Sequence, residues 1–550
     1  SGSGITTLGN ALNIVAGASP GIVTVGGTAT LAAAGNLNLN SDVSGTASIA
    51  NSAGSITGNV TVQRFIPATA GRKYRYLAAP FATGPSISSS WQQNIYITGS
   101  GSGGTTCPAL TSHSNGFDAS TLNNSSMLTF DETTATLVSS SSGLDTYSNA
   151  WKSVASTNTT NLSAGIGYNV FIRGNRTQGC ALLTTPSTTA NAVTLSATGS
   201  IQTGTFPFVV TYNALNGEGW NLIGNPYPSE IDWDAATGWT KTNVASTYYI
   251  YSPVGDNFAT YNSTGPASAN GGTRYIPSGQ AFYIQANAAA PLLSCAESVK
   301  TATNNAPLLK GNKPFDIRVE IINSANKSDE SFFYLNRNQS DSFDLNYDME
   351  KMGNPSNVNV YSIDSKGKKY VGNNIANIKD GEEKICILGI GEAYNGNYTM
   401  NVAAPNMPNF YQIFFRDHFL KTERQLMTED TIQYAFSVTN DLATAGNSRF
   451  DILIKNLRPH STGIVNSLAK QSIITVFPNP SSDLINLRIS NGLDQTESLT
   501  LTNTLGQVLI TRIKPETNSS IDLSEMAPGI YFINARLNNG SMSTLKVIKK

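Results

Sequence analysis

Val476-Phe477-Pro478-Asn479-Pro480 opens the stretch that decides the fold of this chain, and Leu545-Lys546-Val547-Ile548-Lys549-Lys550 closes it. Between them, short apolar and polar alternations are separated by Gly, Pro, Asn and Asp, which is typical of antiparallel strands joined by turns. The alternations cover residues 484–490, 498–503, 507–513, 530–537 and 543–548. Asn539-Gly540 stands before the last one, where a two-residue hairpin turn needs positive φ at both positions. The stretch therefore predicts a small all-β sandwich.

Four motifs in residues 472–550 resemble those of one known family. They are Phe477-Pro478-Asn479-Pro480, then Gly506-Gln507, then Leu523-Ser524 followed by Gly529 and Tyr531, and the terminal Lys546-Val547-Ile548-Lys549-Lys550. In this order and at this spacing they resemble the type A C-terminal sorting domain of the type IX secretion system, the outer-membrane export route of Bacteroidota. The resemblance implies an immunoglobulin-like domain and a chain that is exported to the cell surface or beyond.

The same resemblance implies partners for this domain. In the family, the final strand and the terminal residues engage an outer-membrane shuttle barrel that receives cargo from the type IX translocon. A sortase usually removes the domain and links the cargo to a surface lipopolysaccharide. Nothing in the resemblance says what the remaining residues do.

The composition restricts the class of protein. Charged residues make up 13% of the 550 residues and the net charge is −1, which argues against nucleic acid or an anionic membrane as a partner because both require a basic face. Only 10 of the 35 Lys and Arg and 11 of the 36 Asp and Glu precede Thr301. Such a Gly-, Ser-, Thr- and Asn-rich chain is typical of extracellular β-proteins, and its length predicts roughly three to five domains.

Residues 1–62 carry a weak repeat. Gly27-Thr28-Ala29-Thr30-Leu31 is echoed 18 residues later by Gly45-Thr46-Ala47-Ser48-Ile49, and short apolar runs follow each copy. A period near 20 with small residues at the corners is typical of a β-solenoid, and a Gly/Thr-rich linker is the alternative. Because a solenoid needs several rungs, this hypothesis also favours a chain that is a piece of a longer polypeptide.

Residues 63–300 form a low-charge region with two related halves. The run from Tyr74 to Pro80 resembles that from Gly219 to Pro226, since each is an aromatic and apolar strand ended by a proline. Later in each half comes a second matched run, Gly165 to Ile172 and Ser278 to Ile284. The segment that begins at Gly219 and ends at Trp233 also resembles one found in large secreted surface proteins of Bacteroidota.

Residues 301–457 regain an ordinary charge content and contain seven or more predicted strands, which favours an antiparallel β-sandwich of jelly-roll or immunoglobulin-like type. Residues 458–471 then form a linker to the sorting domain at 472–550. The whole chain is thus predicted to be all-β, a series of sandwich modules with a short solenoid segment at the start.

Few residues suit catalysis or metal binding. Three histidines are a poor supply, and the Asp417-His418 pair is disfavoured as a catalytic unit because neighbours on a strand point to opposite faces. Two groups of carboxylates, Glu230 with Asp232 and Asp234, and Asp341 with Asp344 and Asp348, could hold a structural calcium ion, although turn capping is the simpler reading. No catalytic, cofactor-binding or metal residue is therefore assigned. Cys107 and Cys180 flank one candidate module and could form a disulfide.

The function predicted from these observations is that of a non-enzymatic adhesin or structural component of the cell surface, with surface glycans, lipopolysaccharide or other adhesins as partners. A secreted protein that binds or degrades carbohydrate is the alternative, because all five tryptophans lie in the low-charge region and such rings stack on sugars. A permanent subunit of the export or gliding-motility apparatus is the third hypothesis.

Overall fold

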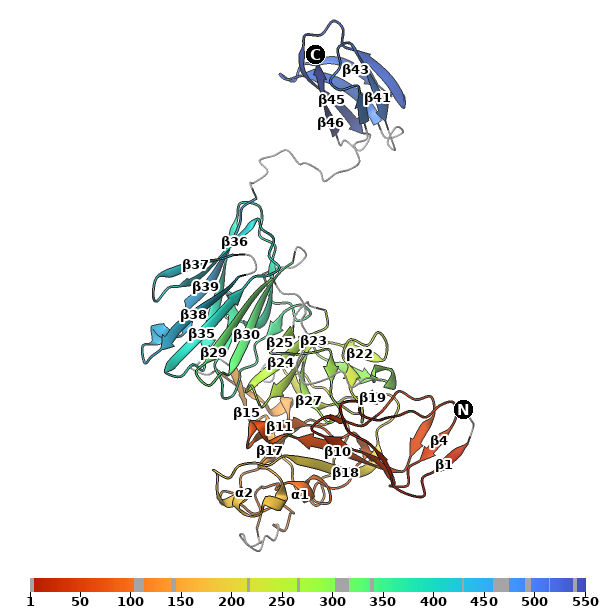
Figure 1. Cartoon of the computed structure of the whole chain (residues 1–550), viewed down its shortest axis with the longest axis vertical. Helices are drawn as coiled ribbons and strands as arrows, with labels where there is room; N and C mark the ends of the chain where they lie inside the picture. The colour runs from red at the N-terminus through yellow and green to blue at the C-terminus, as the bar shows by residue number, and fades with distance from the viewer. Residues whose placement is uncertain are drawn as a thin grey trace. The chain divides into compact units, whose positions relative to one another are not determined.

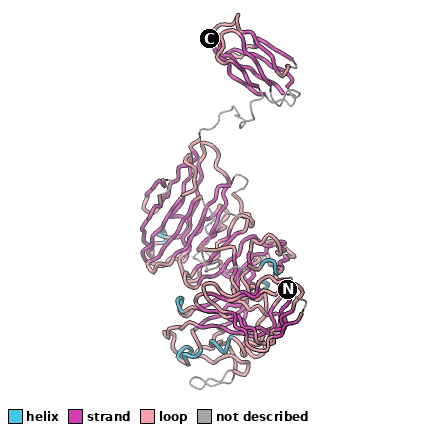
Figure 2. The backbone as a smooth tube through the Cα atoms, turned by 45° about the vertical axis from the view of Figure 1, so that its right-hand side comes forward, coloured by secondary structure: helices cyan, strands magenta, loops and turns pink. Residues whose placement is uncertain are grey.

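The chain consists of two compact units, Ser1–Pro459 and His460–Lys550. The computed structural model describes residues 4–102, 113–139, 145–214, 218–264, 268–301, 316–336, 341–427, 430–458, 474–489, 496–513, 515–537 and 542–550. Within these ranges the α-helices are α1 (Trp91–Asn94) and α2 (Ala181–Thr184), and strands make up most of the remaining regular structure (Figures 1 and 2). The all-β prediction is confirmed. No helix of the described part has the length and apolar character needed to cross a membrane.

The chain begins with parallel rungs. One side of the stack is a parallel sheet of β1 (Ile5–Thr7), β4 (Thr30–Ala32) and β9 (Ser55–Thr57), which pair in that order. A second face is built by β2 (Leu12–Ile14), β5 (Leu37–Leu39) and β10 (Asn59–Ile66). Hydrogen bonds between Asn13 and Asn38 and between Thr30 and Ser55 join side chains 25 residues apart. These pairings are those of a short β-solenoid.

The repeat of the solenoid differs from the 18-residue echo seen in the sequence. Gly45-Thr46 is strand β7, and it pairs antiparallel with β6 (Ser41–Asp42) in a small hairpin at one corner. Leu37-Asn38-Leu39 instead aligns with Leu12-Asn13-Ile14. The prediction of an 18-residue repeat was wrong because it followed Gly, Thr and Ala, which are common in this region, and not the apolar positions that face the core.

The low-charge region contains the same four-stranded sheet twice. The first copy has the order β11-β17-β13-β16, and the second has the order β20-β27-β23-β24 followed by β25. Their bounds are β11 (Lys73–Leu77), β17 (Tyr168–Ile172), β13 (Met127–Phe130), β16 (Trp151–Ser153), β20 (Trp220–Gly224), β27 (Ala281–Ala286), β23 (Val244–Ser252), β24 (Asn257–Asn262) and β25 (Ser268–Ala269). In each copy the leading strand pairs antiparallel with the late strand that the sequence matched to it.

Flanking strands follow the same plan. Around the first copy, β10 pairs antiparallel with β18 (Val193–Ile201), and around the second copy β19 (Phe206–Pro207) pairs antiparallel with β28 (Leu292–Cys295). The tryptophan after each leading strand also makes the same contact. Trp91 lies edge-on to Tyr168 at 5.9 Å between ring centroids, and Trp233 lies edge-on to Phe282 at 6.0 Å.

The two copies touch through reciprocal backbone contacts. The Ala78 N–H donates to the Gly279 carbonyl at 3.0 Å, and the Gly224 N–H donates to the Gly165 carbonyl at 2.9 Å. Ala78 directly follows β11 and Gly224 ends β20, and each stands two residues before the proline that closes its run. The two acceptor glycines precede the two late strands. The halves are therefore joined about an approximate twofold axis that passes between the leading strands.

Gly224 is the position where this joint leaves no room for a side chain. A Cβ there would lie 2.5 Å from the Ile166 carbonyl oxygen and 2.6 Å from the Ala78 Cβ. We expect Gly224→Ala to lower the free energy of unfolding of the larger unit by about 1–3 kcal/mol, because the added methyl overpacks backbone that cannot move away.

The measurement is urea unfolding followed by tryptophan fluorescence, since all five tryptophans belong to residues 1–459. Gly26→Ala is the matched control, because a Cβ at Gly26 meets nothing within 4 Å. The control should change the free energy by less than about 0.5 kcal/mol. Equal midpoints for the two variants would contradict the close approach at the twofold axis.

The region after residue 316 is one large sheet, with the strand order β37-β36-β39-β34-β32-β33-β30-β29-β35-β38 and β31 paired to β33. The bounds are β29 (Ile317–Asn323), β30 (Ser328–Asn336), β31 (Met349–Glu350), β32 (Asn359–Ile363), β33 (Lys369–Ala376), β34 (Glu383–Gly391), β35 (Gly396–Ala403), β36 (Tyr411–Asp417), β37 (Thr422–Leu426), β38 (Thr431–Val438) and β39 (Gly446–Asn456). Thr422 and Tyr434 join the two end strands by a 3.1 Å hydrogen bond between their hydroxyls. The sheet thus folds over on itself around a single core that includes Phe333, Leu388 and Ile452.

This region differs in one respect from the predicted antiparallel sandwich. β30 pairs in parallel with β33, whereas the other described pairings of the sheet are antiparallel. A parallel neighbour requires a long crossover, and residues 337–368 supply it. That crossover carries Glu350 and Lys351, two of the charged residues that meet the low-charge region.

The smaller unit is a two-sheet sandwich. One sheet has the order β40-β41-β44 and the other has the order β43-β42-β45-β46. The bounds are β40 (Ile474–Phe477), β41 (Leu484–Ile489), β42 (Thr496–Asn503), β43 (Val508–Ile513), β44 (Asn518–Asp522), β45 (Gly529–Leu537) and β46 (Met542–Lys549). Buried side chains from both sheets, including Leu487, Leu501 and Val547, form its core. The five predicted strands are present, and β40 and β44 are additional.

Candidate functional site

The opening and closing motifs of the smaller unit form one structure. The Asn479 amide donates from Nδ2 to the Lys546 carbonyl at 2.7 Å, and the Asn479 Oδ1 accepts from the Ile548 N–H at 2.9 Å. Ser481 continues the contact, since its N–H donates to the Ile548 carbonyl and its carbonyl accepts from the Lys550 N–H, each at 2.9 Å. The flanking prolines, Pro478 and Pro480, have no N–H to offer, so the asparagine side chain replaces the ladder bonds that they cannot make. The last strand is therefore held on both edges.

Asn479 provides a direct test of this arrangement. We expect Asn479→Ala to make the Ile548 amide exchange its hydrogen about tenfold faster, because two hydrogen bonds worth about 1–2 kcal/mol in total are lost. Hydrogen exchange measured by NMR reports this amide individually. Asn518→Ala is the control, because Asn518 is exposed on β44 and enters the described hydrogen bonds only through its backbone. Unchanged exchange at Ile548 would contradict the proposed role of Asn479.

Most of the remaining sorting-motif residues shape the fold. Gly506 has φ of 80° in the turn between β42 and β43, and the Asn503 side chain accepts from the Gln507 N–H at 3.0 Å and donates to its Oε1 at 2.8 Å. Leu523 is fully buried, and the Tyr531 hydroxyl donates to the Ala527 carbonyl at 2.7 Å.

The other motif residues divide into buried and exposed groups. The Ser524 N–H donates to the Asp522 carboxylate at 2.8 Å, and Gly529 begins β45 opposite Lys549. Lys549 is 8% exposed and pairs with Asp483 at 3.3 Å. Exposed side chains of the motifs are open to a partner, and they include Phe477, Pro478, Pro480, Gln507, Ser524, Lys546 and Lys550.

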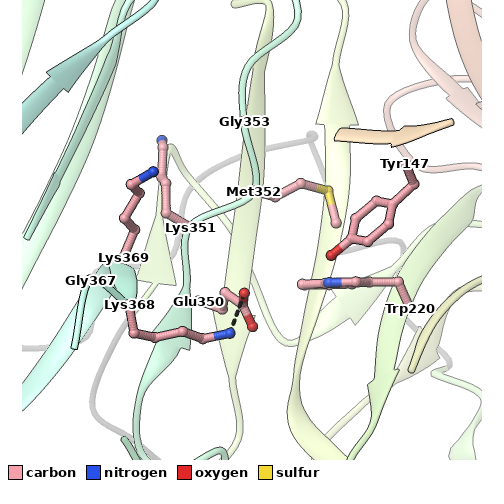
Figure 3. Close-up of a pocket in the computed structure, with 9 residues that line it drawn as sticks. All are labelled: Tyr147, Trp220, Glu350, Lys351, Met352, Gly353, Gly367, Lys368 and Lys369. Carbon is pink, nitrogen blue, oxygen red and sulfur yellow. Dashed lines mark ion pairs between the residues drawn. The ribbon is translucent and has the colours of Figure 1, made fainter. Parts of the chain in front are cut away.

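In the larger unit, one pocket lies where the crossover of the large sheet meets the low-charge region (Figure 3). Trp220 and Tyr147 stand on one side with Met352 directed toward them, and Glu350 forms an ion pair with Lys368 on the other. Glu350 also accepts from the Gln285 amide at 3.1 Å, and burial raises the pKa of its carboxyl. The cavity measures about 60 Å³, far below the ~300 Å³ at which small-molecule sites begin. It is a joint between modules and leaves no space for a substrate.

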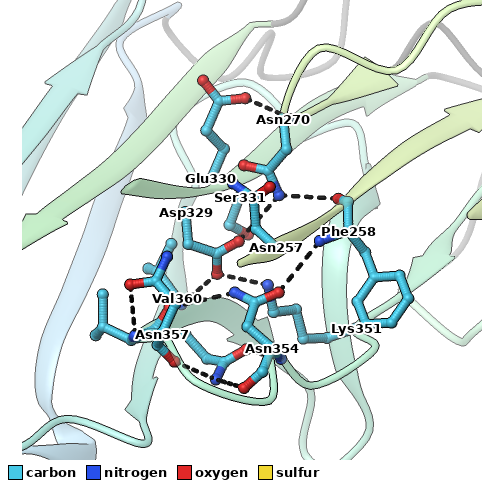
Figure 4. Close-up of polar contacts among 12 residues, drawn as sticks. Asn257, Phe258, Asn270, Asp329, Glu330, Ser331, Lys351, Asn354, Asn357 and Val360 are labelled. Carbon is cyan, nitrogen blue, oxygen red and sulfur yellow. Dashed lines mark hydrogen bonds and ion pairs between the residues drawn. The ribbon is translucent and has the colours of Figure 1, made fainter. Parts of the chain in front are cut away.

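A buried polar network lies beside this joint (Figure 4). The Asp329 carboxylate, fully buried, accepts from the Lys351 ammonium at 2.5 Å, from the Val360 N–H at 2.8 Å and from the Asn270 amide at 3.0 Å. The Asn354 side chain accepts from the Phe258 N–H at 3.3 Å. Since Asn270 and Phe258 belong to the second half and the other residues to the large sheet, the network fastens the two regions to each other.

The carboxylate groups considered for calcium are divided among separate partners. Asp232 forms a bidentate pair with Arg274 at 2.6 and 2.7 Å, and Glu230 accepts from the Thr301 hydroxyl at 2.9 Å. In the other group, Asp344 and Asp348 bond to nearby backbone N–H groups, and Asp341 pairs with Lys384. Among the described residues no cluster of three His, Cys, Asp or Glu is arranged to hold a metal ion.

Asp417 and His418 have different partners, as the alternation of strand side chains predicts. Asp417 is buried and pairs with Arg449 at 3.0 Å, while His418 is half exposed and lies 2.7 Å from Asp451. Of the other two histidines, His113 is buried beside Asn123 and His460 lies outside the described residues.

The cysteines fall into two classes. Cys180 takes part in a disulfide, and its predicted partner Cys107 lies outside the described residues. Cys295 and Cys386 are free and buried, and burial raises the pKa of each thiol to about 12. A thiol with such a pKa is almost entirely protonated at neutral pH, so these two cysteines are poor nucleophiles.

The five tryptophans serve packing. Trp91, Trp220 and Trp233 are buried, and Trp151 and Trp239 are half-buried against other rings. Trp151 meets Phe130 edge-on at 5.3 Å and Trp239 meets Trp233 at 4.8 Å. They do not form the exposed platform on which a sugar ring stacks.

Comparison with known families gives two matches. Residues 475–550 match the secretion system C-terminal sorting domain, and residues 108–453 match a domain of unknown function, DUF8693. The chain belongs to the DUF8693 family. No curated protein matches it. The DUF8693 match runs from the first half through the large sheet, so it covers the regions that the Asp329 network joins.

The sorting-domain match confirms the resemblance stated from the motifs. This DUF8693 protein is a cargo of the type IX secretion system, and it is exported across the outer membrane to the cell surface or the extracellular space. Its sorting domain interacts with the type IX secretion machinery.

Proposed function

We propose that residues 1–459 are the delivered part of this protein and that they act at the cell surface as a non-enzymatic adhesin or structural component. The observation that supports the proposal most strongly is that neighbouring modules are held together by specific polar contacts. The duplicated halves are joined by the twofold backbone contacts. The second half is joined to the large sheet by the hydrogen bonds of Asn270 to the buried Asp329 and of Phe258 to Asn354, which hold neighbouring modules in a fixed arrangement. Such construction suits a protein that bears load or presents a surface.

The side chains that could take part in catalysis or bind sugar are engaged in structural contacts, which supports the same proposal. Asp232, Asp417 and Asp329 are each bound to an arginine or a lysine, the free thiols are buried, and the tryptophans pack in cores. A carbohydrate-degrading enzyme needs a pair of carboxyl groups open to a sugar. Among the described residues, the carboxylate groups singled out from the sequence are occupied by neighbours.

The experiment compares a strain that lacks this protein with the same strain carrying it on a plasmid. Attachment of cells to glass, to host glycans and to other cells should fall in the deletion strain and return on complementation. The purified full chain should also release no reducing ends from a panel of polysaccharides. Polysaccharide cleavage by the purified chain, or unchanged attachment and an unchanged cell envelope in the deletion strain, would refute the proposal.

For the attachment to the cell we propose the route that the family suggests, in which a shuttle barrel receives the sorting domain and a sortase replaces it with surface lipopolysaccharide. Lys546 in the last strand and Lys550 directly after it are exposed charged groups that the barrel could contact. Mass spectrometry of the surface protein tests this route. A mature species that ends before residue 472 and carries the polysaccharide supports it, whereas a species that retains residues 472–550 supports a permanent subunit of the export or gliding apparatus.

A further inference from the structure

Two arginines stand at inward-facing positions of β10 and β11, consecutive strands that belong to different sheets. On β10, Arg64 shares a strand face with Val60, Val62 and Ile66, all of which are buried. On β11, Arg75 is 6% exposed and shares a face with Leu77. An arginine at such a position loses hydration, which costs several kcal/mol unless an anion compensates for it.

Among the described residues, no carboxylate is bound to either guanidinium. The Arg64 side chain makes no hydrogen bond or ion pair with them, and its Nε is fully buried. Arg75 donates only to backbone carbonyls, from Nη1 to Tyr74 at 3.1 Å and from Nη2 to Gly71 at 3.3 Å. Burial lowers the pKa of each arginine to about 10. At Arg75 the nearby Tyr251 and Asp256 oppose this effect and raise the pKa.

Other arginines of this protein show the usual arrangement. Arg274, Arg416 and Arg449 each hold an aspartate in an ion pair at 3.0 Å or less. Arg64 and Arg75 have no such partner within the described ranges, and the same holds for Arg72, which bonds to backbone carbonyls, and for Arg173, which bonds to the Thr98 hydroxyl. Arg64 and Arg75 differ from these two because they border the same cavity.

Both arginines line a cavity of about 280 Å³ between the two halves. The walls are mainly apolar and aromatic, and they come from β10, β11 and β23 with the loop that follows β23. The wall residues include Ile66, Pro67, Leu77, Ile250, Tyr251 and Val254. This size lies just below the ~300 Å³ at which small-molecule pockets begin, and the combination of apolar walls with a few charged groups is typical of them.

The acidic groups near the cavity are bound to other residues. Asp256 binds Lys73, Lys327 and the Tyr251 hydroxyl, so its charge is shared between two lysines. Arg64 also borders a second hollow, which Asp42 and Glu230 line. The Glu230 carboxylate accepts from the Thr301 hydroxyl at 2.9 Å.

We propose that this cavity binds a small organic carboxylate, with the carboxylate held by Arg64 and Arg75 and the apolar body packed between the halves. Arginine is suited to this because its planar guanidinium matches a carboxylate through two parallel hydrogen bonds. The apolar walls select a ligand with a hydrocarbon or ring body over a bare inorganic anion. This site adds a small-molecule ligand to the surface role proposed above and does not depend on that role.

The test uses the full chain and three probes: benzoate, its neutral isostere benzamide, and inorganic phosphate. Isothermal titration should show saturable benzoate binding that is about tenfold or more weaker for Arg64→Gln and for Arg75→Gln, because a charge-assisted hydrogen bond is lost in each. Lys379→Gln, which removes an exposed positive charge outside the cavity, should bind benzoate as the parent does. Benzamide and phosphate should bind at least tenfold more weakly than benzoate.

Unfolding followed by tryptophan fluorescence separates a ligand site from a structural role. Without benzoate, Arg64→Gln should unfold at the same urea concentration as the parent or higher, because a half-buried charge without a bound carboxylate is removed. Benzoate should raise the midpoint of the parent and not that of the variant. The proposal would be overturned by absence of benzoate binding, by binding of benzoate to both glutamine variants as tightly as to the parent, by equal affinity for phosphate and benzoate, or by a lower midpoint for Arg64→Gln.

Discussion

Removal of residues 545–550 is expected to abolish export of this protein. These residues supply most of the pairing between β46 and β45, from Ile533 opposite Leu545 to Gly529 opposite Lys549. They also include Val547, which is fully buried, and they carry the groups that Asn479 and Ser481 hold. Without them the edge of β45 and part of the core of the sandwich face water, and the folded domain that the machinery recognises is lost.

The measurement is the distribution of the protein between the cell surface, the medium and the cell interior in a type IX host. The truncated chain should be missing from the surface and the medium and should accumulate inside. Tryptophan fluorescence of the truncated chain should match the parent, because the tryptophans belong to the other compact unit. Surface delivery of the truncated chain at the parental level would contradict the assignment.

A double variant distinguishes folding from recognition. Lys546 and Lys550 are exposed, and their hydrogen bonds in the smaller unit come from the backbone. We expect Lys546→Ala with Lys550→Ala to leave the sandwich folded, because only solvated side chains are removed. Reduced export by this folded variant would show that the machinery contacts the lysines, whereas normal export would place recognition in the strand itself.

The sorting domain could be predicted well from the sequence because its signals are local. Gly506 allows a turn with positive φ, and alternating residues mark the strands, so five strands were placed to within about two residues. Two strands were missed for physical reasons. Ile474–Phe477 is short and runs into Pro478, and Asn518–Asp522 has Ile521 as its one apolar residue.

The duplication was also visible, because matched strands kept their aromatic and apolar pattern. What the sequence could not supply is the way in which the copies meet, since Ala78 and Gly224 touch through backbone atoms that carry no residue signature. The solenoid period was recoverable from Leu12-Asn13-Ile14 and Leu37-Asn38-Leu39, which are stacked in the structure, but the more frequent Gly-Thr-Ala pattern obscured it.

The inward arginines could have been found by alternation alone. Val60, Val62 and Ile66 mark the buried face of β10, and Arg64 falls between them in the same period. The Asp329 network, in contrast, joins residues from separate strands and loops, and polar residues such as Asn270 and Lys351 resemble ordinary surface residues in the sequence. Only the folded chain shows which of them are buried together.

Asp329→Asn is expected to lower the free energy of unfolding of the larger unit by about 3–5 kcal/mol. The substitution removes the anion from a pair whose side chains are 2% and 0% exposed, for Lys351 and Asp329 respectively. The Lys351 ammonium then stays buried without a counterion or must move out of the core and break the packing around it. The loss is read from the urea midpoint of tryptophan fluorescence. Asp430→Asn, at an exposed carboxylate, should change the same midpoint by less than about 0.5 kcal/mol.

A second variant tests whether the buried charge is the cause. In the double variant Asp329→Asn with Lys351→Met neither member of the buried pair is charged, and the methionine fills much of the space of the lysine stem. We therefore expect it to recover more than half of the stability lost in Asp329→Asn, as when other buried ion pairs are replaced by apolar groups. If the double variant is no more stable than Asp329→Asn, the loss comes from the hydrogen bonds to Val360 and Asn270. The network would then fasten the modules by hydrogen-bond geometry and not by charge.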